Sequence, residues 1–314
     1  MIENLLFILN DISPVFILVI LGMFLRKIGM INEQFVKLTS YFIFNVSLPV
    51  FVFIKLYNVE LVDTFDLKFV LFIILGTVLI FGISWFIAAK VAPEPSDKGV
   101  FIQGSFRSNY AIVGFAIILN ILGERALAKA SLLIAFILPL YNLLAVFALT
   151  MSHHSGKQIL NKAFKEIALN PLVLGVVAAI PFSLLKIEIP EMLKVTGEHL
   201  SVIALPLALI SIGGSLNLAA VKKASYLSIY SSLLKIVLFP ALMTVAAYYF
   251  GFTGYELGII FIIFGCPTAI ASFVMAAAMK GNIELAGNIV VISTLGSIIT
   301  MTLGLLILTE LQLI

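Results

Sequence analysis

Long, continuously apolar segments separated by short polar or charged stretches run along the whole chain. Ten such segments lie at roughly residues 7–25, 38–57, 69–91, 99–122, 127–150, 165–185, 195–217, 226–250, 256–279 and 284–309. Each is close to the length of about 20 residues that a helix needs to cross a bilayer. The apolar residues follow one another instead of alternating at every second position, so the segments predict helices and not barrel strands. The pattern therefore predicts an all-α membrane protein with ten transmembrane helices.

The composition supports this fold class and excludes several others. Of the 314 residues, 62% are hydrophobic and 11% are charged, against roughly 45–50% and about 25% in soluble domains. A soluble enzyme, a nucleic-acid-binding protein and a disordered protein are thereby excluded, and the surrounding medium is expected to be the lipid bilayer. The single cysteine, Cys266, rules out a disulfide within the chain. The three histidines have no partners at metal-ligand spacing, so no metal site is expected.

Charged residues between the spans are distributed unevenly. Of the 19 basic residues, 11 flank the connections after odd-numbered spans, 6 lie on the other side, and the last two, Arg107 and Lys235, fall inside spans. The 16 acidic residues have the opposite bias, 5 against 11. Lys and Arg are in excess on the cytoplasmic side of membrane proteins. We therefore expect a multi-pass protein of the cell membrane with both termini extracytoplasmic and a cytoplasmic loop around Ser152–Lys162.

The two halves of the chain resemble each other. Three motifs recur at offsets of 157, 159 and 157 residues, namely Pro14 with Pro171, Lys27 with Lys186, and Leu48-Pro49 with Leu205-Pro206. Five spans per half is an odd number, so the second copy enters the bilayer from the opposite face, as in the inverted repeats of secondary transporters. We expect a first five-helix repeat at 1–150, a cytoplasmic linker at 151–164 and an inverted repeat at 165–314. The alternative is that prolines simply recur in membrane helices, where they are tolerated.

Small and polar residues interrupt the middle of spans four and nine. Span four contains the run from Gly104 to Ala111, followed by Gly114, and span nine contains the run from Gly265 to Ser272. Pro267 removes a helical hydrogen bond, so we expect span nine to break at Cys266-Pro267 and to cross span four near Asn109. Gly114 and Pro267 are the expected hinge positions. Helix N-termini that meet at such breaks attract anions.

The two basic residues inside the spans are costly in a bilayer and therefore informative. No acid lies at comparable depth, so an incoming carboxylate is a suitable partner for Arg107, whose guanidinium binds carboxylates in a bidentate way. Snorkelling to the interface, or capping of carbonyls freed by a broken helix, stays open for both Arg107 and Lys235. The expected substrate-binding residues are Arg107, Ser108, Asn109, Tyr110, Asn142, Pro267, Thr268 and Ser272, with Asn45, Lys235 and Asn288 as further candidates. A stripe of Ser293, Ser297 and Thr300 is expected to make hydrogen bonds between helices.

Several of these motifs together resemble one known family. They are Arg107-Ser108-Asn109-Tyr110 with Gly114, Asn45 before Leu48-Pro49, Asn170-Pro171, and Pro267-Thr268-Ala269. In this combination the chain resembles the auxin efflux carrier family, whose bacterial branch is described as predicted permeases or malate permeases. The resemblance implies a scaffold domain and a transport domain with crossing broken helices, as in bile-acid:sodium symporters, and transport of organic carboxylates. One departure is that Phe115 and Ala116 follow Gly114 where the family often has a proline.

The expected function is that of a secondary transporter, an efflux carrier or permease for a small organic anion such as a carboxylate. It would work by elevator-type alternating access, with spans four, five, nine and ten moving. No cofactor is expected, the coupling ion is left open between a proton and sodium, and a homodimer is left open as well. One alternative is an intramembrane enzyme, which is disfavoured because no span contains acids for metal binding or acid–base chemistry. The other is a passive channel.

Overall fold

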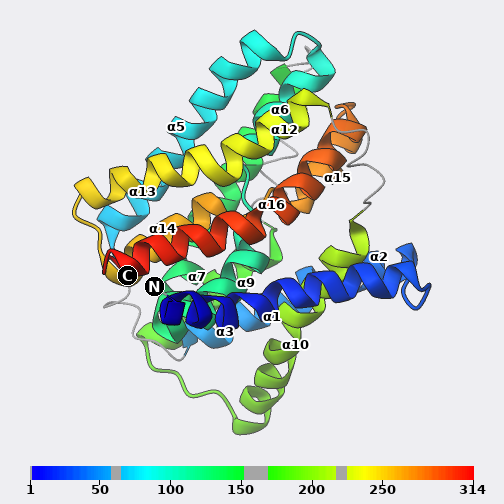
Figure 1. Ribbon diagram of the computed structural model, residues 1–314. Helices are drawn as coiled ribbons and strands as arrows, with labels where there is room; N and C mark the ends of the chain where they lie inside the picture. The colour runs from blue at the N-terminus through cyan, green and yellow to red at the C-terminus, as the bar shows by residue number, and fades with distance from the viewer. Residues whose placement is uncertain (1, 58–64, 152–168, 217–224) are drawn as a thin grey trace.

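The computed structural model describes residues 2–57, 65–151, 169–216 and 225–314. Within these ranges the regular elements are helices, as Figure 1 shows. The predicted cytoplasmic linker at 151–164 lies outside the described residues, apart from Met151.

The helices follow one another with short connections. Those of the first half are α1 (Ile2–Lys27), α2 (Glu33–Phe42), the π-helical turn η1 (Ile43–Ser47), α3 (Leu48–Tyr57), α5 (Leu67–Val91), α6 (Pro95–Phe106), the π-helical turn η2 (Tyr110–Gly114) and α7 (Phe115–Met151). Those of the second half are α9 (Pro171–Leu184), α10 (Glu191–Ser215), α12 (Tyr226–Leu233), the π-helical turn η3 (Leu234–Leu238), α13 (Phe239–Tyr249), α14 (Gly254–Gly265), α15 (Ile270–Ala278) and α16 (Ile283–Glu310).

Among the described residues, seven helical stretches are long and apolar enough to cross a membrane. One of them, 110–150, covers parts of two predicted spans. The backbone turns at Gly123, whose φ is 79°, and this turn separates the two spans. The predicted spans at 165–185 and 256–279 correspond to the shorter apolar helix α9 and to the interrupted pair α14 and α15. The protein is therefore an all-α membrane protein, in which the predicted segments reappear as helices.

Several helices begin at a side chain that satisfies their first free amides. Asn32, Asp66, Asn170, Ser225 and Asn282 each precede a helix and accept a hydrogen bond from an amide two or three residues later. Such caps contribute about 1 kcal/mol each. They fix where the apolar segments start, which the hydrophobic pattern alone leaves open by several residues.

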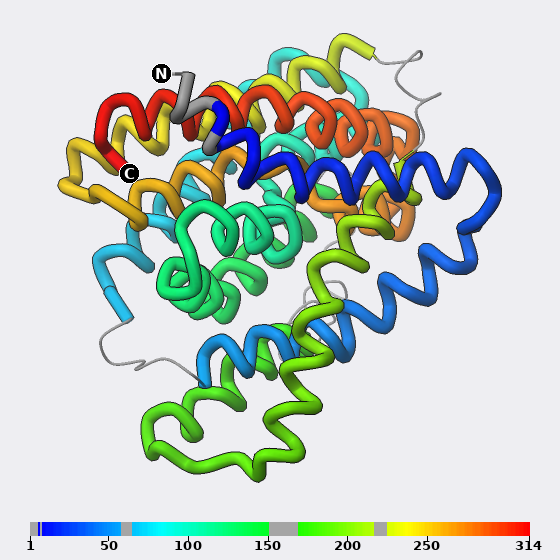
Figure 2. The backbone as a smooth tube through the Cα atoms, turned by 60° about the horizontal axis from the view of Figure 1, so that its bottom comes forward, coloured from blue at the N-terminus to red at the C-terminus, as the bar shows by residue number. Residues whose placement is uncertain are grey.

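The helices pack in two groups. The scaffold group consists of α1, α2, η1, α3, α9 and α10, which pack mainly on one another. The crossing group consists of α5, α6, η2, α7 and all the elements from α12 to α16. Figure 1 shows α1, α3 and α10 across its lower part and the crossing group above them, with both chain ends on the same side, as they also are in Figure 2. Helices α7 and α16 make most of the contact between the groups.

Glycines hold the scaffold group together where α1 crosses α10. A Cβ atom built on Gly213 would lie 1.9 Å from the Val19 carbonyl oxygen, and one on Gly22 would lie 2.0 Å from the Ile210 carbonyl oxygen. The two backbones are therefore in direct contact. In a bilayer, where apolar side chains gain little from leaving lipid, such close approach between small residues is a main source of helix association.

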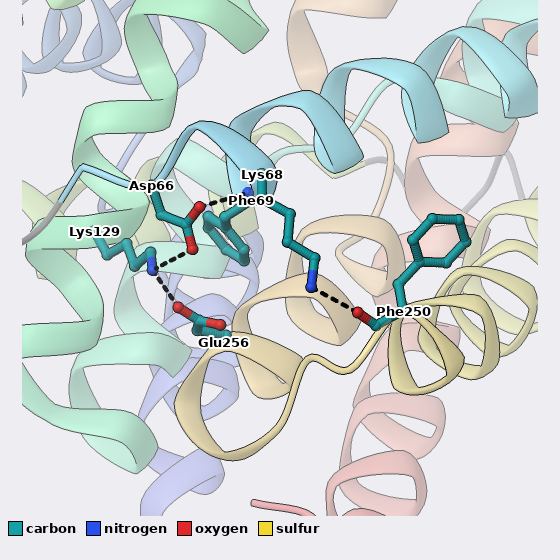
Figure 3. A network of polar contacts seen from close by, with 6 residues as sticks. All are labelled: Asp66, Lys68, Phe69, Lys129, Phe250 and Glu256. Atoms are coloured by element: carbon teal, nitrogen blue, oxygen red, sulfur yellow. Dashed lines mark hydrogen bonds and ion pairs between the residues drawn. The ribbon is translucent and has the colours of Figure 1, made fainter.

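A buried lysine ties three helices of the crossing group at one end. Figure 3 shows Lys129 of α7 reaching Glu256 in the first turn of α14 and Asp66, the residue before α5. Its Nζ lies 3.6 Å from the Asp66 Oδ2 atom and 4.8 Å from the centre of the Phe69 ring. Since the Lys129 side chain is 8% exposed, the ion pairs are poorly screened by water. This cluster links α5, α7 and α14.

The contact between α1 and α10 generates a prediction. Gly213→Ala should destabilise the protein by about 1–3 kcal/mol, because the methyl group has no space beside the Val19 carbonyl. The measurement is the thermal melting temperature of the purified protein in detergent. Gly82→Ala in α5 is the matched control: its Cβ meets nothing within 4 Å, and alanine favours a helix over glycine. A Gly213→Ala protein as stable as Gly82→Ala would contradict the close approach.

Candidate functional site

Two helices are interrupted in the middle of the crossing group. Helix α6 ends at Phe106, and helical backbone resumes at Tyr110. Helix α14 ends at Gly265, and α15 begins at Ile270. The break predicted at Cys266-Pro267 is therefore confirmed. The helix break of span four does not lie at Gly114, as predicted: the interruption is at residues 107–109, and Gly114 is part of the π-helical turn that follows.

Gly114 has a packing role instead. A Cβ atom on it would lie 2.9 Å from the Tyr110 Cβ and 3.2 Å from the Cys266 Sγ. Glycine thus lets the segment after the first break lie against the start of the second break. Gly114 is therefore required for this close approach and does not mark the interruption of the helix.

The two interruptions cross and pair through their backbones. The Asn109 amide donates to the Pro267 carbonyl at 2.8 Å, and the Ala269 amide donates to the Arg107 carbonyl at 3.3 Å. Ser108 and Thr268 face each other as a short antiparallel bridge. The predicted crossing near Asn109 is confirmed. Each break supplies backbone partners to the other, which lipid cannot do.

Side chains satisfy further backbone groups at the crossing. The Thr268 hydroxyl donates to the Gly104 carbonyl at 2.7 Å, and the Thr268 amide donates to the Ser293 hydroxyl at 3.1 Å. The Lys235 ammonium donates to the Phe264 carbonyl at 2.5 Å. Of the roles left open for Lys235, capping of a freed carbonyl is the one observed. The predicted interhelical hydrogen bonding of the serine stripe is observed at Ser293.

Arg107 lies at the centre of this arrangement. It is the first residue after α6, and it is 6% exposed. Its Nη2 donates to the Asn142 side-chain oxygen at 2.8 Å, and its Nη1 contacts the Met275 sulfur. Among the described residues it forms no ion pair with an acid. A guanidinium held by one amide and one thioether keeps donors available for an anion.

The electrostatics of the crossing differ from the simple expectation of anion-attracting N-termini. Each break presents a helix C-terminus, of α6 or α14, together with the N-terminus of the segment that follows. The C-terminal ends carry partial negative charge, and each has a basic side chain beside it, Arg107 or Lys235. Lys235 donates to a carbonyl of the α14 end, whereas the Arg107 guanidinium contacts the side chains of Asn142 and Met275.

The other predicted site residues are only partly brought together. Ser272 is buried in the first turn of α15, and the buried Tyr110 begins η2 and packs on Phe115. Asn288 is buried on α16. Asn45 does not join the crossing: it lies in η1 of the scaffold group, is exposed, and donates to the Tyr41 carbonyl of its own helix.

One residue of this region was missed from the sequence. Gln103 lies one turn before Arg107 on α6, is 1% exposed, and neither atom of its amide has a hydrogen-bond partner among the described residues. An unsatisfied buried amide costs roughly 1–3 kcal/mol. The available signal was an amide within an apolar span at helical spacing from Arg107. The Ser272 hydroxyl, also buried, likewise has no partner in the described part of the chain.

A cavity of about 620 Å³ lies between the two groups of helices. Its walls come from α1, α3 and α10 of the scaffold group and from α7 of the crossing group. It is mostly apolar, with Lys55, Glu124 and Glu198 as its charged residues. Lys55 and Glu124 form an ion pair at 2.7 Å that joins α3 to α7. One wall residue, Ala116, lies in the first turn of α7, two positions after η2, and none of the predicted substrate-binding residues is among those that line the cavity.

Comparison with known proteins places the chain among transporters. Residues 7–157 and 152–305 match a family described as membrane transport protein. An uncharacterized transporter of Methanothermobacter thermautotrophicus is 23% identical over 296 residues, which cover 94% of this chain and 96% of that protein. An uncharacterized transporter of Methanocaldococcus jannaschii is 24% identical over 303 residues, which cover 92% and 95%. The predicted resemblance is confirmed at the level of a membrane carrier family.

The unsatisfied amide of Gln103 leads to a prediction about stability. Gln103→Leu should raise the melting temperature, because it removes two buried polar atoms that have no partner and keeps a similar volume. Ser105→Ala on the same helix is the control: its hydroxyl bonds to the Phe101 carbonyl and to Ser231, so its removal should not stabilise the protein. A lower melting temperature for Gln103→Leu would mean that the amide is satisfied in the empty protein.

Proposed function

This chain belongs to the membrane transport protein family, and on that premise we propose that it is a secondary transporter of a small organic anion. Its relatives are transporters, so the protein is a transporter and not an enzyme. We infer an anionic substrate from Arg107. Its buried guanidinium lies at the crossing of two broken helices and forms no ion pair with an acidic side chain among the described residues. A carboxylate is the group that a guanidinium binds best.

The architecture proposed for this transporter is a five-plus-five inverted repeat with ten spans. Two consecutive parts of the chain match the family, and the order of elements in the first half, including an interrupted fourth span, recurs in the second. The backbone bridge between the breaks is antiparallel, which agrees with two copies that run in opposite directions. Binding sites of such transporters lie where discontinuous helices meet.

Alternating access would come from sliding of the crossing group against the scaffold group. Two features support this movement. The crossing group is tied within itself by the Lys129 cluster and by the paired breaks, so it would move as one body. The cavity lies along the boundary between the groups, between α7 on one side and α1, α3 and α10 on the other. The Lys55–Glu124 ion pair joins the groups and would have to separate during the movement.

We propose the predicted orientation in the cell membrane, with both termini outside. The uneven distribution of basic residues supports it, and both chain ends lie on the same side of the molecule in Figures 1 and 2. In this orientation Lys55, near the end of α3, and Glu124 of α7 lie at the extracytoplasmic ends of their spans. The cavity faces outward, because both residues line it.

Single-cysteine labelling tests this orientation. In a Cys266→Ala background, Gln312→Cys should react with a membrane-impermeant maleimide added to intact cells, whereas Lys280→Cys should react only after the membrane is opened. Both positions are exposed, so differences in reactivity report the side of the membrane. Labelling of Lys280→Cys from outside, with protection of Gln312→Cys, would reverse the topology.

The role of Arg107 is tested by transport and by binding. Proteoliposomes with the wild-type protein should take up at least one of a panel of labelled carboxylates, with L-malate as the first probe. Arg107→Ala should weaken binding of that carboxylate by about 10–150-fold, as expected for loss of a charge-assisted pair of about 1.5–3 kcal/mol. Arg107→Lys should restore part of the affinity, because a point charge cannot reproduce the planar fork.

The control is Arg125→Ala, which removes a guanidinium outside the crossing, near the Tyr255 ring. It should leave the affinity unchanged. A folded Arg107→Ala protein with wild-type affinity would remove Arg107 from the site. Failure of every carboxylate to be transported by the wild-type protein would remove the anion itself from the proposal.

A further inference from the structure

Helix α6 turns one face toward the seam between α7 and α15. Val100 lies on the side of α15, because a Cβ atom built on Gly281, just after that helix, would be 2.7 Å from its Cγ2. Phe106 packs on Tyr141 of α7, with ring centres 5.9 Å apart. Gln103 is three residues from each, and three residues turn a helix by about 300°, about 60° short of a full turn. The Gln103 side chain therefore points midway between these two directions, into the seam.

The Arg107 guanidinium occupies the same seam, one turn further along the chain. Its Nη2 donates to Asn142 of α7, and its Nη1 contacts the Met275 sulfur of α15. A thioether is a weak acceptor, so a carboxylate oxygen is a better partner for this second donor. Four residues of helix span about 6 Å. Gln103 therefore lies within reach of a small molecule whose carboxylate is bound by Arg107.

Two polar side chains on this seam are buried without a hydrogen-bond partner among the described residues. They are the Gln103 amide, at both of its polar atoms, and the Ser272 hydroxyl. Ser272 lies three residues before Met275 on α15, and residues at this spacing are neighbours on a helix surface. Native proteins leave few buried polar groups unpaired, and each such group requires an explanation. Three polar side chains, one of them charged, thus converge on one place.

The chemistry of an amide limits what its partner can be. The Gln103 Oε1 atom accepts hydrogen bonds, and the Nε2 atom donates them. A methylene group would satisfy neither atom. A second carboxylate would accept from Nε2 but has no proton for Oε1. A hydroxyl group both donates and accepts, so it suits the amide and the neighbouring serine as well.

We propose that Gln103 determines the specificity of this transporter by binding a hydroxyl group that the substrate carries close to the carboxylate bound by Arg107. The substrate class is then a small hydroxy acid. This inference rests on the proposed transport of an anion and deepens it. A site built to bind a substrate hydroxyl rejects the analogue without it, because the polar groups of the site are then left unpaired.

The experiment compares carboxylates that differ by one hydroxyl group. The pairs are L-lactate with propionate, 3-hydroxybutyrate with butyrate, and L-malate with succinate. Each ligand is titrated onto the purified protein in detergent, and the rise in melting temperature gives its apparent affinity. The wild type should bind the hydroxylated member of at least one pair about 10-fold more tightly or better.

Gln103→Leu should abolish this preference and keep the affinity for the member without the hydroxyl. A loss of that kind is specific, since a general structural defect would weaken both members of the pair. Gln103→Met, which is closer in shape to glutamine, serves the same purpose if the leucine protein is not recovered.

Two further variants separate Gln103 from its surroundings. Arg107→Ala should weaken the binding of both members of a pair alike, because it removes the partner of the carboxylate that they share. Ser105→Ala on the same helix should change neither affinity, since its hydroxyl bonds to Phe101 and Ser231 on another face of α6.

The possible failures are distinguishable. If the wild type binds both members of every pair equally, or if Gln103→Leu keeps the preference, Gln103 does not recognise a hydroxyl group and this inference is wrong, while the role of Arg107 stands. If the wild type binds no carboxylate of the panel, the anion proposal fails, and this inference fails with it.

Discussion

The structure depends on one constraint, which is that every backbone group set free in the bilayer interior must find a partner within the protein. Two helices stop in the middle of the crossing group, at Phe106 and at Gly265. The backbones of the two interruptions form hydrogen bonds with each other. The side chains of Thr268, Ser293 and Lys235 form hydrogen bonds with further backbone groups. The two irregular segments are therefore stabilised by each other and by side chains of neighbouring helices.

Much of this architecture could be predicted from the sequence, because the length of an apolar run and the position of a proline are local features of the chain. Apolar runs of sufficient length located the helices. Pro267, in a run of small and polar residues, located the second break, whereas four other prolines lie inside continuous helices. The first break has no proline, and Gly114 was a misleading marker. Residues 107–109 open because the chain around Pro267 offers them backbone partners, and that pairing joins positions far apart in the sequence. The same limit applies to Lys235, whose acceptor at Phe264 is brought near only by the fold.

The candidate site was predictable in kind but not in detail. Arg107, Asn109 and Thr268 were singled out as polar residues within apolar spans, and the structure brings them together at the crossing. Their side chains have different partners. The Thr268 hydroxyl donates to a backbone carbonyl, whereas the Arg107 guanidinium contacts the side chains of Asn142 and Met275. Gln103 was not predicted, because the notable observation is that its buried amide has no hydrogen-bond partner among the described residues. An amide without a partner is visible only when its neighbours are known.

The pairing of the two breaks has a consequence for synthesis of the protein in the cell. The Asn109 amide donates to the carbonyl of Pro267, a residue that the ribosome adds 158 positions later. At 5–20 residues per second, that interval is about 8–30 s. During this time the first break has reached the membrane while its partner does not yet exist. The nascent chain must shelter three unpaired residues in the insertion machinery, in water or against another protein until the second half arrives.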